Sequence, residues 1–80
     1  MATPDGWSEV DGALERELRF ASFPNAIAFV NNLADLAERE NHHPTIRVEF
    51  SRVTVRWWTH TAGGVTDLDR RLAELTNALL

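Results

Sequence analysis

Cysteine is absent from this chain, which excludes disulfide bonds and thiolate metal sites. No apolar run approaches the roughly 18 residues that a membrane-spanning helix needs. The opening segment, MATPDGWSEVDG, lacks the basic start and the apolar core of a signal peptide. Together these absences favour a cytoplasmic protein with no membrane partner.

Basic residues are also scarce, with 8 Lys and Arg against 12 Asp and Glu and a net charge of −4. Binding nucleic acid without sequence preference requires a basic patch, and no block of Lys or Arg stands out here. We therefore expect no nucleic-acid partner. The 80 residues are expected to form one domain, 1–80, with residues 1–5 as a loose tail. A core this small is marginally stable, which favours a homo-oligomer.

The first structured segment is expected to be a β-hairpin. Asp11-Gly12 is a typical two-residue turn between antiparallel strands. After it, apolar and charged residues alternate, which predicts a half-buried strand, and residues 7–10 would form its short partner. The apolar residues of one parity are Leu14, Leu18 and Phe20.

A helix is predicted over residues 22–40. Ser22 is suited to cap its first turn, and Pro24 is tolerated there because the amide hydrogens of that turn are unpaired. Apolar residues then recur at three- and four-residue spacing, as expected of a helix that packs on a core. They are Ala26, Phe29, Val30, Leu33, Leu36 and Ala37.

A second hairpin is predicted after this helix. Residues 45–50 alternate, with Ile46, Val48 and Phe50 on one face, and residues 53–60 alternate in turn. The tight connection between the two strands is expected at residues 51–52.

A final helix closes the chain. Thr66 is its expected cap, with Asp69 as the acidic partner of a capping box. Its apolar stripe is Leu68, Leu72, Leu75 and Leu79. The order of the elements predicts an α+β fold, in which a four-stranded antiparallel sheet carries two helices on one face.

The second hairpin is expected to bring all three histidines of the chain together. With a turn at residues 51–52, residues whose numbers sum to about 103 face each other, which sets His43 opposite His60. Neighbouring residues of a strand point to opposite faces, so His42 and His43 cannot both point the same way. One of these two imidazoles is expected to enter a pocket beside His60, while the other flanks it.

Three interpretations of the histidines are open at this point. They are solvated loop residues, ligands of a catalytic zinc ion, or an acid–base set in which one imidazolium donates a proton and a neutral imidazole accepts one. Adjacent histidines rarely converge on one ion, so zinc is the weakest interpretation. Glu38 precedes His42 by one helical turn, where it either orients an imidazole or is a solvated charge.

These residues resemble the signature of the pterin-4a-carbinolamine dehydratases. In that signature, E-x-x-x-H-H-P is followed at fixed spacings by an aromatic residue, a histidine and an aspartate. The matching positions are Glu38, His42, His43, Pro44, Phe50, His60 and Asp69. The upstream pattern is also similar, at Gly6, Trp7, Gly12, Leu18, Phe20, Phe23, Ala26 and Phe29.

The resemblance implies a reaction and a site. Members of this family, also called 4a-hydroxytetrahydrobiopterin dehydratases, remove water from the 4a-carbinolamine to give quinonoid dihydropterin, with no metal or organic cofactor. It implies that His42, His43 and His60 are catalytic, with His42 and His60 handling the departing 4a-hydroxyl and the N5 proton. The implied pterin-binding positions are Asn41, His42, His43, Trp58, Thr59, His60 and Thr61. The implied supporting positions are Glu38, Pro44 and Asp69.

The resemblance carries two further expectations. Relatives assemble as homodimers, some of which pair into homotetramers, and many have an extra N-terminal helix that no residues match here. Other proteins of this fold act as assembly factors or dimerisation cofactors. A non-catalytic scaffold is therefore the alternative to the dehydratase, although the three histidines favour the enzyme.

Overall fold

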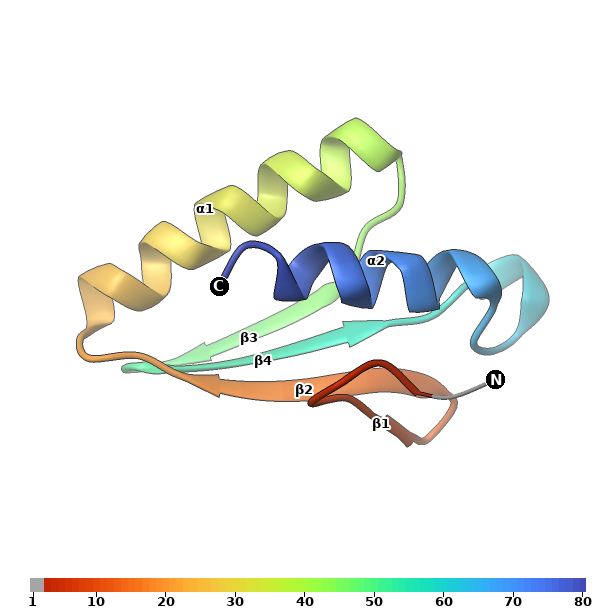
Figure 1. Cartoon of the computed structure of the whole chain (residues 1–80), viewed down its shortest axis with the longest axis horizontal. Helices are drawn as coiled ribbons and strands as arrows, with labels where there is room; N and C mark the ends of the chain where they lie inside the picture. Colours follow the sequence, from red (N-terminus) through yellow and green to blue (C-terminus); the bar gives the residue numbers. More distant parts are fainter. Residues whose placement is uncertain (1–2) are drawn as a thin grey trace.

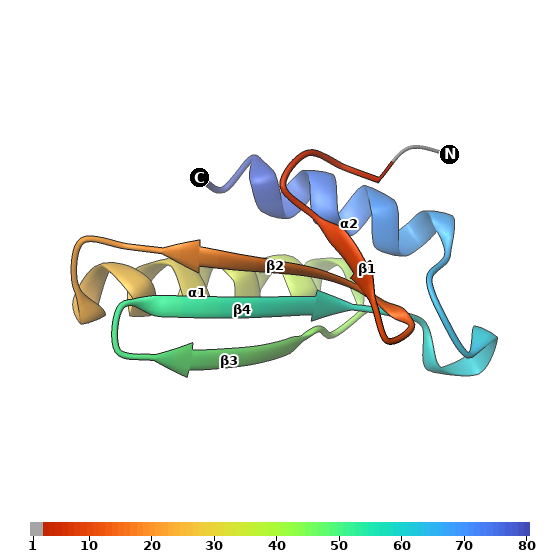
Figure 2. The same cartoon turned by 90° about the horizontal axis from the view of Figure 1, so that it is seen from below.

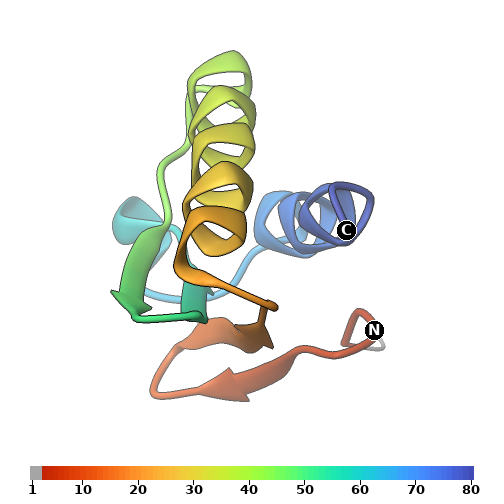
Figure 3. The ribbon, with the colours of Figure 1, turned by 90° about the vertical axis from the view of Figure 1, so that its left-hand side faces the viewer.

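The computed structural model of the chain describes residues 3–80, which form one sheet and two helices (Figure 1). In chain order the elements are β1 (Ser8–Val10), β2 (Ala13–Arg19), α1 (Phe23–Glu40), β3 (Thr45–Glu49), β4 (Arg52–Trp57), the short 3₁₀ turn η1 (His60–Ala62) and α2 (Asp67–Asn77). The strands pair antiparallel in the order β1-β2-β4-β3. Both helices cover the same face of the sheet, and the other face is open (Figures 2 and 3). The α+β fold class is confirmed.

The first hairpin forms where the sequence predicts it. Asp11 and Gly12 have φ angles of 47° and 79°, the left-handed backbone that a tight turn between twisted strands requires. The turn pairs Val10 with Ala13 and so fixes the register of β1 against β2. On β2, Leu14 is buried opposite Trp57 of β4, at the centre of the sheet.

Helix α1 confirms both its predicted cap and its predicted apolar face. Ser22 accepts a hydrogen bond from the Asn25 amide at 3.2 Å, and a proline occupies the first turn. The helix ends at Asn41, whose left-handed backbone (φ 51°) turns the chain toward β3. Its buried residues are Ala26, Phe29, Leu33, Leu36 and Ala37, while Val30 is half-buried against the same core.

Helix α2 has its predicted capping box and most of its predicted apolar stripe. Thr66 and Asp69 form the reciprocal bonds of the box, as expected. Leu68 is 38% exposed, and the residues that point inward are Asp69, Leu72, Ala73 and Thr76. Leu72 is fully buried and Leu75 and Leu79 pack against the core, so Leu68 is the one residue of the predicted stripe that lies outside it.

The second hairpin turns one residue earlier than the sequence predicts. Glu49 pairs with Arg52, so the turn lies at Phe50 and Ser51, and Phe50 is 80% exposed with a φ of 57° instead of facing the core. Continued beyond Thr45, this register would set position 43 opposite position 58. The predicted pairing of His43 with His60 is therefore wrong, because His60 lies beyond the end of β4, in η1.

The N-terminal segment is anchored as far as residue 3. Pro4 is buried, and the Asp5 carbonyl oxygen accepts a hydrogen bond from Asn77 Nδ2 at 3.0 Å. Trp7 Nε1 donates to Asn77 Oδ1 at 2.8 Å, so α2 holds this segment through one side chain. Pro4 and Asp5 thus have contacts with the fold, residues 1–2 lie outside the described part, and the loose tail over residues 1–5 stays a prediction. Within that described part, neither helix has the length and apolarity that crossing a membrane would take.

Candidate active site

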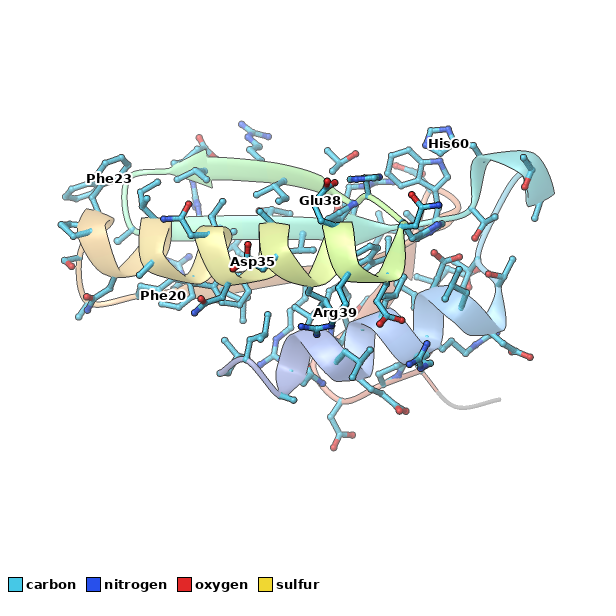
Figure 4. All side chains as sticks on the ribbon, turned by 90° about the horizontal axis from the view of Figure 1, so that it is seen from above. Phe20, Phe23, Asp35, Glu38, Arg39 and His60 are labelled. Carbon is cyan, nitrogen blue, oxygen red and sulfur yellow. The ribbon has the colours of Figure 1, made fainter. Side chains whose placement is uncertain are left out.

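The three histidines lie near the end of the sheet where α1 stops and β4 stops, although in different environments. His42 and His43 occupy the loop after α1, and His60 begins η1 after β4. Figure 4 shows His60 toward the end of the molecule opposite Phe23, with Glu38 between the two. His42 contacts a buried carboxylate, whereas His43 and His60 are exposed, so the interpretation as solvated loop residues still fits these two but not His42.

His42 is the histidine that turns inward. Its Nε2 lies 2.9 Å from Asp69 Oδ1 and 3.0 Å from the carbonyl oxygen of Trp58. Its ring stacks on the fully buried Trp57, with centroids 5.8 Å apart and an interplanar angle of 13°. The side chain is 15% exposed. This imidazole is thus held in one orientation by a carboxylate, a carbonyl group and an aromatic ring.

Asp69 is the fully buried carboxylate that connects His42 to helix α2. Its Oδ2 accepts hydrogen bonds from the Thr66 amide and from Thr59 Oγ1, both at 2.8 Å, and lies 3.1 Å from Thr66 Oγ1. A carboxylate buried without such donors would be costly. The same side chain therefore closes the cap of α2 with one oxygen and contacts His42 with the other.

His43 points to the surface instead. Its Nε2 hydrogen-bonds Glu38 Oε2, and the two side chains are 61% and 77% exposed. Solvent screens a pair of this kind, so it orients the imidazole weakly. Of the two interpretations of Glu38, orientation of an imidazole is the one that the contact supports, and the imidazole is that of His43 rather than His42.

His60 is exposed and lies against Trp58. The two ring centroids are 4.7 Å apart, with an interplanar angle of 41°. Trp58 also provides the carbonyl oxygen that contacts His42, so this one residue lies between the inward and the outward histidines. The Trp58 indole and the His60 imidazole together form an aromatic surface that is open to solvent.

The other predicted site residues differ in their exposure to solvent and in their hydrogen bonds. Asn41 and Thr61 are exposed, and Pro44 is half-buried. Thr59 is fully engaged: its hydroxyl contacts Asp69 and Thr66, and its backbone amide and carbonyl bond Gly64 at 2.9 and 3.3 Å. Trp57 and Thr66 also contribute to the site, yet neither is among the site residues predicted from the sequence. Trp57 contacts His42 and Thr76, which are distant in the chain and which local patterns do not reveal, whereas Thr66 is predicted only as a helix cap.

In the described part of the chain, neither a metal-ligand cluster nor the hollow beside α2 coincides with the histidines. No three His, Asp or Glu side chains within residues 3–80 are grouped so that they could hold a metal ion. A hollow of about 390 Å³ lies at the N-terminal segment and α2, and no histidine lines it. Its lining residues are Thr3, Pro4, Asp5, Glu74 and Asn77. The chemistry-bearing side chains are therefore at the histidine end of the sheet, away from this hollow.

Comparison with known proteins identifies the family. The family model described as "Pterin 4 alpha carbinolamine dehydratase" matches residues 1–79. The chain belongs to the pterin-4a-carbinolamine dehydratase family. A protein from Marinobacter nauticus that carries this family's name is 48% identical over 66 residues, which are 82% of this chain and 60% of that protein. The chain therefore spans less than two thirds of that relative.

Two solved structures of the dehydratase family are similar to this fold. The "transcriptional coactivator/pterin dehydratase from Brucella Melitensis" superposes with a TM-score of 0.88 at 39% identity, covering 94% of this chain and 82% of that one. A "pterin dehydratase-like protein" identified as "a RuBisCO assembly factor in the alpha-carboxysome" gives a TM-score of 0.80 at 25% identity, covering 95% and 90%. One solved structure similar to this fold is thus that of a protein named as an assembly factor.

Proposed function

We propose that this chain is a 4a-hydroxytetrahydropterin dehydratase. It removes water from the 4a-carbinolamine of a tetrahydropterin and releases quinonoid dihydropterin, which reduction returns to the tetrahydro form. The observation that carries the proposal is one firmly held imidazole, His42, at the same end of the sheet as two exposed ones, His43 and His60. The family membership supports the same reaction.

The reaction requires two proton transfers, and the histidines are suited to them. The C4a–O bond breaks as an imidazolium gives its proton to the departing hydroxyl, which leaves as water. A neutral imidazole takes the N5 proton, and the N5 electron pair forms the C4a=N5 double bond. Positioned imidazoles perform such transfers near neutral pH. We assign the two transfers to His42 and His60, and no metal or organic cofactor takes part.

The remaining site residues bind and support the pterin in this proposal. His43, oriented by Glu38, polarises the substrate from the exposed side. Trp58 and His60 provide flat surfaces for the pterin ring, and Asn41 and Thr61 lie at exposed positions on either side. Pro44 limits the backbone of His43 to extended conformations, which keeps the loop in shape. Asp69 holds His42.

A scaffold role is the second candidate, and a specific observation favours it. One similar solved structure belongs to a pterin dehydratase-like protein named as an assembly factor. A protein that serves only as a scaffold would not need a histidine buried against a carboxylate, and here that contact is intact. The enzyme is therefore the better supported of the two.

Dehydration of freshly generated 4a-hydroxytetrahydropterin, followed by absorbance, tests the proposal. The wild type is expected to accelerate the reaction, and His42→Ala and His60→Ala are each expected to reduce turnover by two or more orders of magnitude, roughly the share of a positioned acid or base. Arg39→Ala serves as the control, because Arg39 is an exposed residue in the last turn of α1, close in the chain to His42 but without a contact to it. Failure of folded wild type to accelerate dehydration, with or without pterin binding, would direct the search to protein partners.

A further inference from the structure

The Nε2 atom of His42 faces two groups that can only accept a hydrogen. One is Asp69 Oδ1 at 2.9 Å and the other is the Trp58 carbonyl oxygen at 3.0 Å. A nitrogen between two acceptors must carry its hydrogen in the neutral ring as well as in the imidazolium. Within residues 3–80, Nδ1 has no hydrogen-bond partner, and no buried side-chain nitrogen or oxygen lacks one. Nδ1 is therefore the nitrogen that reaches solvent.

The orientation of Asp69 is fixed from the other side, by the cap of α2. The Thr66 backbone amide, which can only donate, lies 2.8 Å from Oδ2. The Thr59 hydroxyl donates to the same oxygen, also at 2.8 Å. These donors require an acceptor at that position, and they leave Oδ1 as the oxygen that contacts His42.

Asp69 is the one charged group, within residues 3–80, that contacts the His42 ring. From α1, Glu38 is bound to His43, and Glu40 is paired with Arg71 of α2 at 2.8 Å. After β4, His60 lies against the Trp58 ring. His42 therefore pairs with a single carboxylate, whose own geometry is set by the helix cap.

We propose that the N-terminal cap of α2 fixes the tautomer of His42, so that this histidine exchanges protons only through Nδ1, with Asp69 and Thr59 as positioning residues. The inference deepens the proposed function and rests on it for the catalytic meaning of Nδ1. Whether His42 takes the N5 proton or gives one to the departing hydroxyl, the transfer occurs at Nδ1. Nε2 keeps its hydrogen throughout, and solvent restores the Nδ1 proton state after the product leaves.

The decisive test is the ¹⁵N spectrum of the imidazole nitrogens, which reports the tautomer without requiring any activity. With ¹⁵N-labelled histidine, the neutral His42 ring of the wild type is expected to carry its hydrogen on Nε2. A ring with its hydrogen on Nδ1 would overturn the proposal. If the wild type shows no dehydratase activity, the proposed function fails while the spectrum still decides the tautomer.

The Asp69→Asn variant tests whether changing the partner of His42 changes the tautomer seen in the same ¹⁵N spectrum. The Thr66 amide requires the carboxamide oxygen on its side, so the carboxamide NH₂ faces His42 Nε2 and replaces one of its two acceptors with a donor. The Trp58 carbonyl oxygen remains as the other acceptor, so the neutral ring is expected to shift from pure Nε2–H toward a mixture with the Nδ1–H tautomer. Turnover is expected to fall by roughly 10²- to 10⁴-fold, as when a triad histidine is held in the wrong tautomer. An unchanged tautomer in the folded variant would contradict control by the helix cap.

Thr59 provides a milder pair of variants that keep the fold. Thr59→Val retains the shape and removes the hydroxyl, whereas Thr59→Ser retains the hydroxyl. Because this hydroxyl contacts Asp69 and Thr66, Thr59→Val is expected to lower kcat by about threefold to tenfold with little change in KM, the range of one lost hydrogen bond. Thr59→Ser is expected to restore kcat. Equal kcat in Thr59→Val and the wild type, or a defect in KM alone, would remove Thr59 as a positioning residue.

Discussion

His42 and His43 are neighbours in the chain with opposite surroundings. His42 turns inward, stacks on buried Trp57 and contacts a carboxylate that has no exposed surface. His43 turns outward to Glu38, and both side chains of that pair are mostly exposed. The difference follows from alternation along an extended chain, which sends adjacent side chains to opposite sides. One histidine is positioned by the folded core, while the other is positioned by a contact that water weakens.

The adjacent tryptophans repeat this contrast and give the largest expected effect. Trp57 is fully buried and donates to Thr76 at 3.1 Å, so Trp57→Ala is expected to cost about 3–5 kcal/mol of the free energy of unfolding. Trp58 is only half-buried, and Trp58→Ala is expected to cost about 1 kcal/mol. Urea denaturation measures both values. Equal destabilisation by the two variants would mean that the inner and outer sides of the site are not distinct.

The two carboxylates provide the next test. Asp69→Ala removes the side-chain half of the capping box and leaves buried donors without an acceptor, which is expected to lower the free energy of unfolding by about 2–3 kcal/mol. Glu38→Ala removes an exposed pair and is expected to change it by less than about 0.5 kcal/mol. Thermal unfolding followed by circular dichroism compares them. A large loss from Glu38→Ala would contradict the weak role given to the outer pair.

Salt distinguishes the same two carboxylates by activity. Raising the ionic strength from about 0.1 M to 1 M shortens the screening length from about 10 Å to 3 Å, which affects exposed pairs most. Glu38→Gln is therefore expected to lower turnover about twofold at low salt and not at all at high salt. The defect of Asp69→Asn is expected to persist at both. A defect of Glu38→Gln that does not change with salt would contradict a Glu38–His43 pair that solvent and ions screen.

Removal of divalent metal is expected to have the smallest effect. Because the proposed transfers use imidazoles alone, dialysis against a chelator is expected to leave turnover unchanged within error. The measurement is the absorbance assay before and after treatment, with zinc added back as the control. Loss of activity that zinc restores would revive the metal interpretation of the histidines.

Local features of the fold are predictable from the sequence because neighbouring residues decide them. The Asp11-Gly12 turn, the Ser22 cap and the capping box of Thr66 and Asp69 each involve residues at most three positions apart, and all are present. The alternating and helical apolar patterns likewise predict the strands and α1, since burial enforces their periodicity.

The second hairpin shows where such prediction fails. An aromatic residue at position 50 is expected inside a sheet, yet Phe50 takes a left-handed backbone in the turn and is exposed. Moving the turn by one residue changes every pairing partner, so His43 lost its predicted partner His60. The contact of His42 with Asp69 spans 27 positions, and no local pattern in the sequence could reveal it.

The position of α2 in the chain has a consequence for how the protein is made. This helix provides Asp69 for His42 and Asn77 for Trp7, so it joins two earlier segments to residues that are synthesised after them. Chains grow at about 5–20 residues per second, and domains fold as units once their parts are available. A nascent chain that ends at η1 lacks the core residues Leu72 and Ala73 of α2, and His42 lacks its carboxylate. The site is therefore completed only when translation has passed through α2.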